Sequence, residues 1–348
     1  MEIIETQCLP ASEESIRLGA QLLREGKLVG MPTETVYGLA ANALDEAAVR
    51  SVFAAKGRPA DNPLIVHVAR KEDCEKYCEV SPMAHRLMDA FWPGPLTILM
   101  PKKPIIPDIV TAGLPTVAMR MPSHPVANAL IAESGCPIAA PSGNTSGKPS
   151  PTRAWHMLDD MRGKIPLILD GGPCEVGVES TVININCPVP VVLRPGGITP
   201  EMLLTVLDEV QVADSVLRPL KEGEVALSPG MRYKHYAPNA ALTLVRGDSE
   251  RVIAACKALY DQAEKAGKKA CILSFTEHLA DYAPRVTCDI GPAGQEEEVA
   301  RRVFDVLRVM DRDGMEVLFS EIVPPEGVGL AIMNRMGRAA AFHVIDAE

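Results

Sequence analysis

Between residues 211 and 240 the apolar periodicity that marks helices and strands disappears. Three prolines and two glycines occupy this stretch, and these residues interrupt continuous helix or strand. Periodic segments resume on both sides, so the stretch is typical of a connection between domains. At 348 residues the chain is long enough for two domains that each bury a core. We expect a domain over 1–210, a linker over 211–240 and a second domain over 241–348.

In the first domain the predicted strands outnumber the helices. Ser12 and Asp45 suit the N-caps of two helices, which end at Gly26 and Gly57. Further helices are expected at 82–91, 125–133 and 199–209, and strands at 28–33, 64–68, 96–100, 116–120, 137–140, 166–169, 178–185 and 189–194. Several strands follow one another without a helix between them. This favours an α+β fold with a twisted mixed sheet over a doubly wound parallel one.

The second domain alternates regularly between the two kinds of element. Strands are expected at 242–245, 270–275, 286–290 and 317–322, and helices at 249–266, 295–312 and 328–341. Such β-α-β alternation predicts a smaller parallel α/β domain, similar to a Rossmann fold.

Charge and composition exclude several classes of protein. The net charge is −10, from 35 basic and 45 acidic residues, which argues against stable binding of a nucleic-acid backbone. No apolar run is long enough to span a membrane, and the first residues are acidic rather than signal-like, so we expect a cytoplasmic protein. The nine cysteines form neither a C-x-x-C pair nor a Cys/His cluster, so no disulfide framework and no protein-bound metal is expected.

Two cations stand at the end of the second helix. Lys56 is in its last turn, and Arg58 lies between Gly57 and Pro59. A lysine there also interacts favourably with the helix dipole, and Arg58 could be an ordinary surface residue. The functional interpretation is that a point charge and a planar fork address a triphosphate.

A small-residue loop follows the strand at 137–140. Ser142, Gly143 and Asn144 are also common turn formers, but the hydroxyl-rich stretch continues to Ser150. Backbone N–H groups in so open a loop can approach an anion. The Walker A pattern and the dinucleotide fingerprint are both absent from the chain.

Two residues at strand ends could bind an amino acid. Arg120 ends an apolar strand, and a buried arginine is costly unless it holds a carboxylate. His67 lies in another apolar strand, where a histidine is more often a hydrogen-bonded core residue than a catalyst.

The linker contains Arg232, Tyr233, Lys234, His235 and Tyr236 in succession. Aromatic and cationic side chains can pin a linker to a domain surface, and such segments can also stack on bases. One short segment in an acidic protein makes a poor RNA-binding surface.

Five ordered motifs resemble the YrdC/TsaC family, the L-threonylcarbamoyladenylate synthases. They are Thr33–Gly38, Lys56–Pro59, Asn62–Leu64, Pro141–Asn144 and Ser180–Val182, while Pro229–Pro238 resembles the long, two-domain form. By this resemblance Lys56 and Arg58 are catalytic. The resemblance assigns ATP binding to Arg58, Asn62, Thr116, Ser142, Asn144, Ser150, Arg194 and Tyr236, and L-threonine binding to Thr35, His67, Arg120, Ala140 and Ser180.

The resemblance implies a reaction of L-threonine, bicarbonate or CO₂, and ATP that gives threonylcarbamoyl-AMP and pyrophosphate. Mg²⁺ would be carried mainly by ATP, and separate proteins would transfer the product to adenosine 37 of tRNA. The linker would form a lid, with Tyr236 closing over the nucleotide. The alternatives are a carbamoyl-transfer enzyme, which would need zinc-finger cysteines that the chain lacks, and an RNA-binding or ribosome-assembly protein with the same fold.

Overall fold

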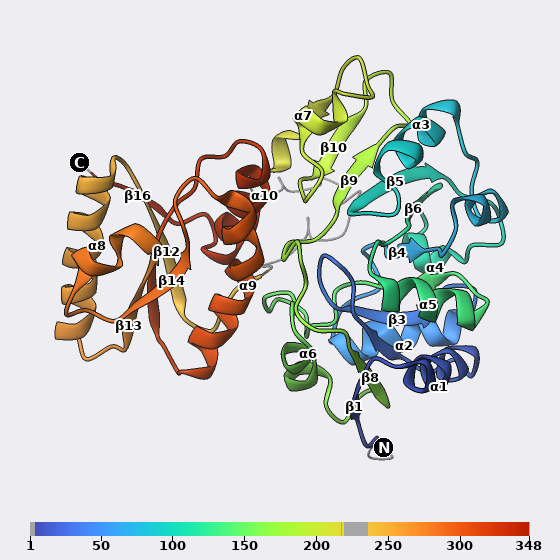
Figure 1. The fold of residues 1–348 in the computed structure, drawn as a ribbon, viewed down its shortest axis with the longest axis horizontal. Coiled ribbons are helices and arrows are strands. Elements are labelled where there is room, and N and C mark those ends of the chain that lie inside the picture. The colour runs from blue at the N-terminus through green and yellow to red at the C-terminus, as the bar shows by residue number, and fades with distance from the viewer. Residues whose placement is uncertain (1–3, 217, 219–235, 348) are drawn as a thin grey trace. The chain divides into compact units, whose positions relative to one another are not determined.

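The computed structural model describes residues 4–216, 218 and 236–347. They form two compact units (Figure 1). Among the described residues, the N-terminal unit holds 4–146 and 150–216, and the C-terminal unit holds 147–149, 218 and 236–347.

A mixed sheet organises the N-terminal unit, as predicted. Its eleven strands have the order β1-β8-β2-β3-β7-β4-β6-β5-β9-β10-β11. Neighbours β4 and β6 are parallel, whereas β5 and β6 are antiparallel. The strands are β1 (Gln7–Pro10), β2 (Val29–Met31), β3 (Gly38–Asn42), β4 (Ile65–His67), β5 (Leu96–Pro101), β6 (Thr116–Arg120), β7 (Ile138–Ala139), β8 (Leu167–Asp170), β9 (Thr181–Asn184), β10 (Val191–Arg194) and β11 (Gln211–Val212).

Capping residues set the ends of the first helices where the sequence predicts them. Ser12 and Ser15 form a capping box at the start of α1 (Glu13–Arg24). Asp45 caps α2 (Glu46–Lys56), and Gly57 ends it at φ 63°, a left-handed conformation that glycine adopts without steric cost. The other helical elements of this unit are η1 (Lys71–Lys76), α3 (Pro82–Phe91), α4 (Asp108–Thr111), α5 (Pro125–Ser134), α6 (Ala154–Met161), α7 (Pro200–Leu203) and η2 (Asp214–Val216).

The sheet buries both of its faces. In β3, Leu39 and Ala41 join a core that includes Val52 of α2, whereas Ala40 joins a separate core with Leu23 of α1. Successive side chains of a strand point to opposite faces, so one strand serves both cores.

The predicted helix over 199–209 is wrong in its length. Thr199 caps α7 as expected, but the helix ends at Leu203 and turns follow it. These turns contain hydrogen bonds such as that from the N–H of Leu207 to the Leu203 carbonyl, and the chain then joins the sheet at β11. The sequence prediction also misses β3, because its glycine and alanines lack the β-branched signature of a strand.

The C-terminal unit is a parallel α/β domain, as predicted. Its five strands have the order β14-β13-β15-β12-β16, and all pairs are parallel. In Figure 1, α8 lies on one face of this sheet and α9 and α10 on the other. Covering on both faces explains why all six residues of β13 are buried. The elements are β12 (Ala241–Arg246), α8 (Ser249–Lys265), β13 (Ala270–Phe275), η3 (Thr276–Tyr282), β14 (Thr287–Gly291), α9 (Glu296–Arg312), β15 (Val317–Glu321), α10 (Val328–Ala339) and β16 (Val344–Asp346).

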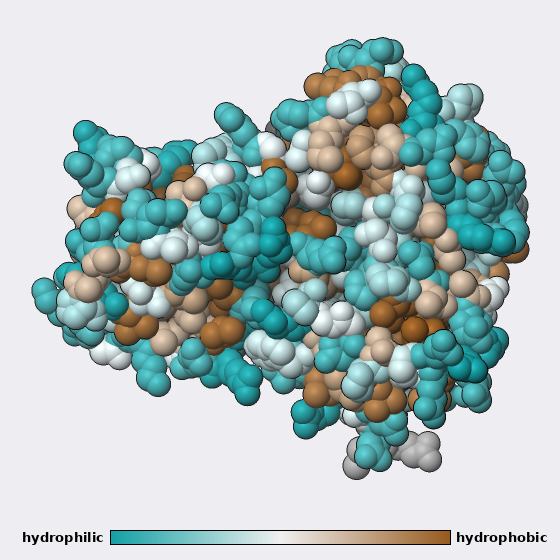
Figure 2. Space-filling view, viewed as in Figure 1, coloured by the Kyte–Doolittle hydropathy of each residue, from teal (hydrophilic) through white to brown (hydrophobic). Residues whose placement is uncertain are grey.

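On the face shown in Figure 2, hydrophobic residues lie scattered among hydrophilic ones. Within the ranges that the structure describes, no helix combines the length and the apolar character needed to cross a bilayer. All nine cysteines are free thiols.

Candidate active site

The two polar motifs of the N-terminal unit meet through backbone hydrogen bonds. The N–H of Gly143 donates to the carbonyl of Tyr37 at 2.7 Å, and the N–H of Tyr37 donates to the carbonyl of Pro151 at 2.8 Å. An antiparallel bridge also joins Gly38 to Ser142. These hydrogen bonds therefore hold segments that are distant in the sequence side by side.

Lys56 fastens the small-residue loop to the end of α2. Its ammonium is buried and donates to the carbonyls of Ser142 at 2.5 Å and Asn144 at 2.7 Å. The Lys56 carbonyl accepts from the N–H of Ser146 at 2.9 Å. From its position in the sequence, Lys56 is expected to address a phosphate or to interact with the helix dipole. In the structure it also holds the loop in place.

Arg58 and Asn62 form a second buried pair. Nη2 of Arg58 donates to the Asn62 carbonyl at 2.7 Å, and the guanidinium lies 5.6 Å from the centre of the Phe53 ring. The Asn62 side chain is fully buried, and its amide has no hydrogen-bond partner among the described residues. A buried amide without a partner costs free energy, so this group is a good candidate for ligand binding.

His67 and Arg120 face each other across adjacent strands. They are paired in the parallel register of β4 and β6, and both are buried. His67 Nδ1 lies 3.2 Å from the Ile65 carbonyl and 3.3 Å from the Ile138 carbonyl. Carbonyls only accept, so we assign the proton of the neutral ring to Nδ1, which leaves Nε2 as its acceptor.

The pKa of His67 is shifted far below its ordinary value. Burial and the nearby Arg120 guanidinium lower it to about 3. His67 is therefore neutral at physiological pH, and it serves as a hydrogen-bonding group rather than a cation.

This shift predicts a pH-dependent loss of stability. As the pH falls below about 6.5, His67 takes up a proton in the unfolded chain but not in the folded one. Stability that is fully present above that pH is thus lost progressively down to about pH 3. At pH 5 the contribution of His67 to the free energy of unfolding should be about 2 kcal/mol smaller than at pH 7.

Urea unfolding of the wild type and of His67→Gln at both pH values measures this contribution as a difference. The variant should lose less stability on acidification. Equal losses in the two proteins would show that the histidine does not titrate as described.

Ser180 lies in a hydroxyl and guanidinium network directly before β9. Its hydroxyl is 2.7 Å from that of Thr97, and Nη2 of Arg194 donates to it at 3.0 Å. Nε of Arg194 donates to the Ser180 carbonyl, also at 3.0 Å. This network links a predicted threonine-binding residue to a predicted ATP-binding residue.

The remaining candidates belong to the same unit, and most of them are buried. Thr35 is fully buried, and its hydroxyl is 2.9 Å from that of Thr33. Ala140 is buried, and the Ser150 hydroxyl donates to Glu179. Thr116 begins β6 on the same side of the sheet as Arg120, roughly 13 Å away along the strand.

Four residues of this region received no role from the sequence: Thr33 and Glu34, which lie within the first motif, and Thr97 and Glu179. Glu34 forms a buried ion pair with Arg120, and Glu179 accepts from Ser150. A buried acidic residue implies a partner, but its identity depends on strand order rather than on local spacing.

The linker prediction falls mostly outside the described residues, since these exclude Arg232 to His235. Tyr236 is described. In the C-terminal unit its ring centroid lies 5.4 Å from that of Phe304 and 5.7 Å from the Arg335 guanidinium carbon. Its role as a lid stays a prediction.

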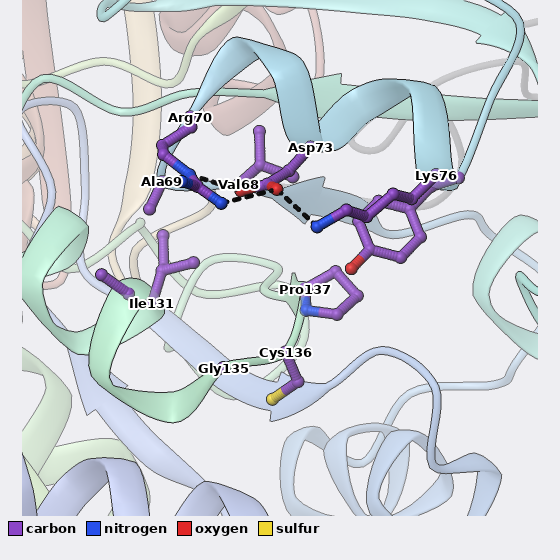
Figure 3. A pocket seen from close by; sticks show the side chains of 11 residues that line it. Val68, Ala69, Arg70, Asp73, Lys76, Ile131, Gly135, Cys136 and Pro137 are labelled. Atoms are coloured by element: carbon purple, nitrogen blue, oxygen red, sulfur yellow. Dashed lines mark hydrogen bonds and ion pairs between the residues drawn. The ribbon is translucent and has the colours of Figure 1, made fainter.

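A cavity of about 410 Å³ lies away from these residues (Figure 3). Arg70 and Lys76 lie along one wall, where both pair with Asp73, and Cys136 and Pro137 lie opposite. No candidate residue lines it. A second cavity of about 410 Å³ is lined by Glu34 and is discussed below.

Family models match both parts of the chain. The Sua5/YciO/YrdC model, described as telomere recombination, matches residues 21–196. A model described as the C-terminal domain of threonylcarbamoyl-AMP synthase matches residues 198–341.

Full-length relatives and a solved structure agree with these models. The threonylcarbamoyl-AMP synthase of Pyrococcus abyssi is 46% identical over 96% of both chains. The enzyme of that name from Bacillus subtilis is 45% identical over 98% of this chain and 97% of its own. The crystal structure of P. abyssi Sua5 complexed with L-threonine has a TM-score of 0.92 at 45% identity, covering 99% of this chain and 100% of that one.

Proposed function

Because this chain belongs to the Sua5/YciO/YrdC family of threonylcarbamoyl-AMP synthases, which are nucleotidyltransferases, we propose that it uses L-threonine, bicarbonate or CO₂, and ATP as substrates. The products are threonylcarbamoyl-AMP and pyrophosphate. Separate proteins then transfer the threonylcarbamoyl group to N6 of adenosine 37 in tRNA.

One observation carries the proposal. The hydrogen bonds of Lys56 to the carbonyls of Ser142 and Asn144 bring a buried cation to a loop of small residues. The Arg58 guanidinium stands two residues further along the chain. Two cations close to each other in the chain, one of them in contact with a loop of small residues that leaves room for a ligand, suit a polyphosphate.

The reaction divides into two bond-forming steps. The neutral amine of threonine attacks CO₂, forms a C–N bond and loses a proton, which gives a carbamate. A carbamate oxygen then attacks the α-phosphorus, and the bond from that phosphorus to the departing pyrophosphate breaks. No protein nucleophile takes part, so positioning and charge stabilisation supply the catalysis.

Each group of side chains has a separate task. Lys56 and Arg58 stabilise charge on the triphosphate, and Asn62, Thr116, Ser142, Asn144, Ser150 and Arg194 bind the nucleotide. Magnesium enters with ATP as part of the substrate and adds positive charge at the phosphates. Thr35, His67, Arg120, Ala140 and Ser180 form the threonine pocket. The P. abyssi relative has been crystallised with L-threonine, which supports this amino acid as the substrate.

Mass spectrometry of a reaction with ATP, threonine and isotopically labelled bicarbonate tests this function. The expected product is threonylcarbamoyl-AMP that carries the label, together with one pyrophosphate for each molecule made. Reactions that lack any one substrate serve as controls. ATP turnover without the labelled adenylate would refute the proposal.

The linker should act as a gate, because a carbamate is unstable in water and a closed site would protect it. Tyr236→Ala in the full chain should therefore lose most synthesis, and a 1–210 fragment should fold but be similarly impaired. Limited proteolysis within 211–240 should slow when ATP and threonine are both present. A fully active fragment, together with a linker that ligands do not protect, would contradict a gate.

A further inference from the structure

Glu34 and Arg120 form a buried ion pair in the N-terminal unit. Oε1 of Glu34 lies 2.7 Å from Nη2 of Arg120, and both side chains are 4% exposed. Removing two charges from water is costly, and hydrophobic replacements of a buried pair are often as stable. A pair in this position therefore calls for a reason beyond stability.

The contacts of Arg120 fix how its guanidinium is presented. Nε points to the Gly94 carbonyl at 3.4 Å, and Nη2 contacts Glu34. Nη1 makes no hydrogen bond to the described part of the chain. Nε and Nη2 thus both face acceptors of the protein, although the contact of Nη2 with Glu34 is an ion pair without hydrogen-bond alignment, and Nη1 remains for a ligand.

The main chain of Glu34 is fixed by a hydrogen bond, and its two carboxylate oxygens have no well-aligned hydrogen-bond partner, which leaves the Arg120 guanidinium as their charged neighbour. The Glu34 carbonyl accepts from the N–H of Val176 at 2.8 Å. Burial raises the pKa of its carboxyl, but the Arg120 guanidinium and the N–H groups of Glu34 and Ser123 outweigh this, so the net pKa is lowered. The carboxylate is ionised and faces Arg120.

We propose that Glu34 is a positioning residue for the substrate carboxylate: it anchors Nη2 of Arg120, so that Nη1 is directed at the carboxylate of the amino acid. This inference rests on the proposed function, in which Arg120 binds L-threonine. Without the anchor the long arginine side chain would adopt several rotamers, and binding would carry the entropy cost of ordering it.

The neighbouring cavity supplies a matched control. Glu175 lines the same space of about 410 Å³ as Glu34. It is exposed, however, and makes no ion pair in the described residues. Glu175→Ala removes the same chemical group from the same cavity without touching Arg120.

Calorimetric titration with L-threonine and with L-threoninamide tests the inference. The amide lacks the carboxylate, so the ratio of its dissociation constant to that of threonine reports the contact with Arg120. Glu34→Ala should weaken threonine binding by about tenfold and lower this ratio by a similar factor. Affinity for ATP should not change, and Glu175→Ala should match the wild type.

A second variant covers the case in which Glu34→Ala does not fold. Glu34→Asp keeps the charge but withdraws it by one methylene, so it cannot hold Nη2 at the same distance. It should fold, bind threonine more weakly and show a reduced ratio. Thermal melting checks the fold of every variant.

Three results would overturn the inference. Threonine binding at or above wild-type affinity in a folded variant would mean that Glu34 competes with the substrate or is idle. Equal losses for threonine, its amide and ATP would assign it a purely structural role. A wild-type protein that does not bind threonine would overturn the proposed function as well, whereas a wild type that binds threonine but makes no adenylate would overturn the function alone.

Discussion

Replacing Arg58 or Lys56 by alanine is expected to reduce turnover at least about a hundredfold, the loss typical of removing one preorganised electrostatic contact. Both side chains are buried, and Lys56 contacts the loop that we assign to the triphosphate. The charge on the leaving pyrophosphate grows in the transition state, so the loss should fall mainly on kcat. Steady-state rates of pyrophosphate release measure it.

The two variants should differ in a second respect. Lys56 also donates to two loop carbonyls, so Lys56→Ala leaves these unpaired and should raise the KM for ATP more than Arg58→Ala does. Arg50→Ala is the matched control, because Arg50 lies on the same helix in an exposed ion pair with Glu46. Near-normal turnover in either active-site variant would refute the catalytic assignment.

Valine should be rejected far more strongly than serine. Serine lacks only the methyl group of threonine, which is worth roughly 1–3 kcal/mol in an apolar pocket. Valine replaces the hydroxyl by a methyl group and leaves a buried polar partner unpaired, so its kcat/KM should fall on the order of a thousandfold or more. Adenylate formation with each amino acid at equal concentration checks this.

Ser180 and Thr35 are the hydroxyls from which we expect this discrimination. The Thr35 hydroxyl is bonded to that of Thr33, and the Ser180 hydroxyl is bonded to Thr97 and Arg194, so each keeps capacity for a further hydrogen bond. Ser180→Ala should therefore bring the valine and serine rates closer together. Equal use of valine and serine by the wild type would contradict a pocket built around the substrate hydroxyl.

Local signals were enough to predict the ends of several elements. The capping residues Ser12 and Asp45 begin their helices where expected, and Gly57 ends α2. These signals succeed because a cap satisfies backbone groups within a few residues of itself. The regular alternation beyond residue 241 likewise predicted a parallel sheet, since parallel strands require crossover connections.

The motifs predicted which residues belong to the candidate site but not all of the contacts between them. Lys56, Arg58 and the Ser142 loop were singled out from sequence, and the structure brings Lys56 and that loop into contact. The sequence could not show that Lys56 donates to loop carbonyls. That contact depends on where β7 delivers the loop relative to the end of α2.

Tertiary structure alone decided the pairings between distant residues. Glu34 meets Arg120, and Ser180 meets Thr97 and Arg194, only because the sheet sets distant strands side by side in a particular register. The helix predicted through 209 ends at Leu203, and the chain pairs with β10 from Gln211 onward, a pairing that the local pattern did not indicate. Capping and periodicity depend on a few neighbouring residues and can therefore be predicted from the sequence. Strand order depends on the packing of the whole unit, so only the tertiary structure shows it.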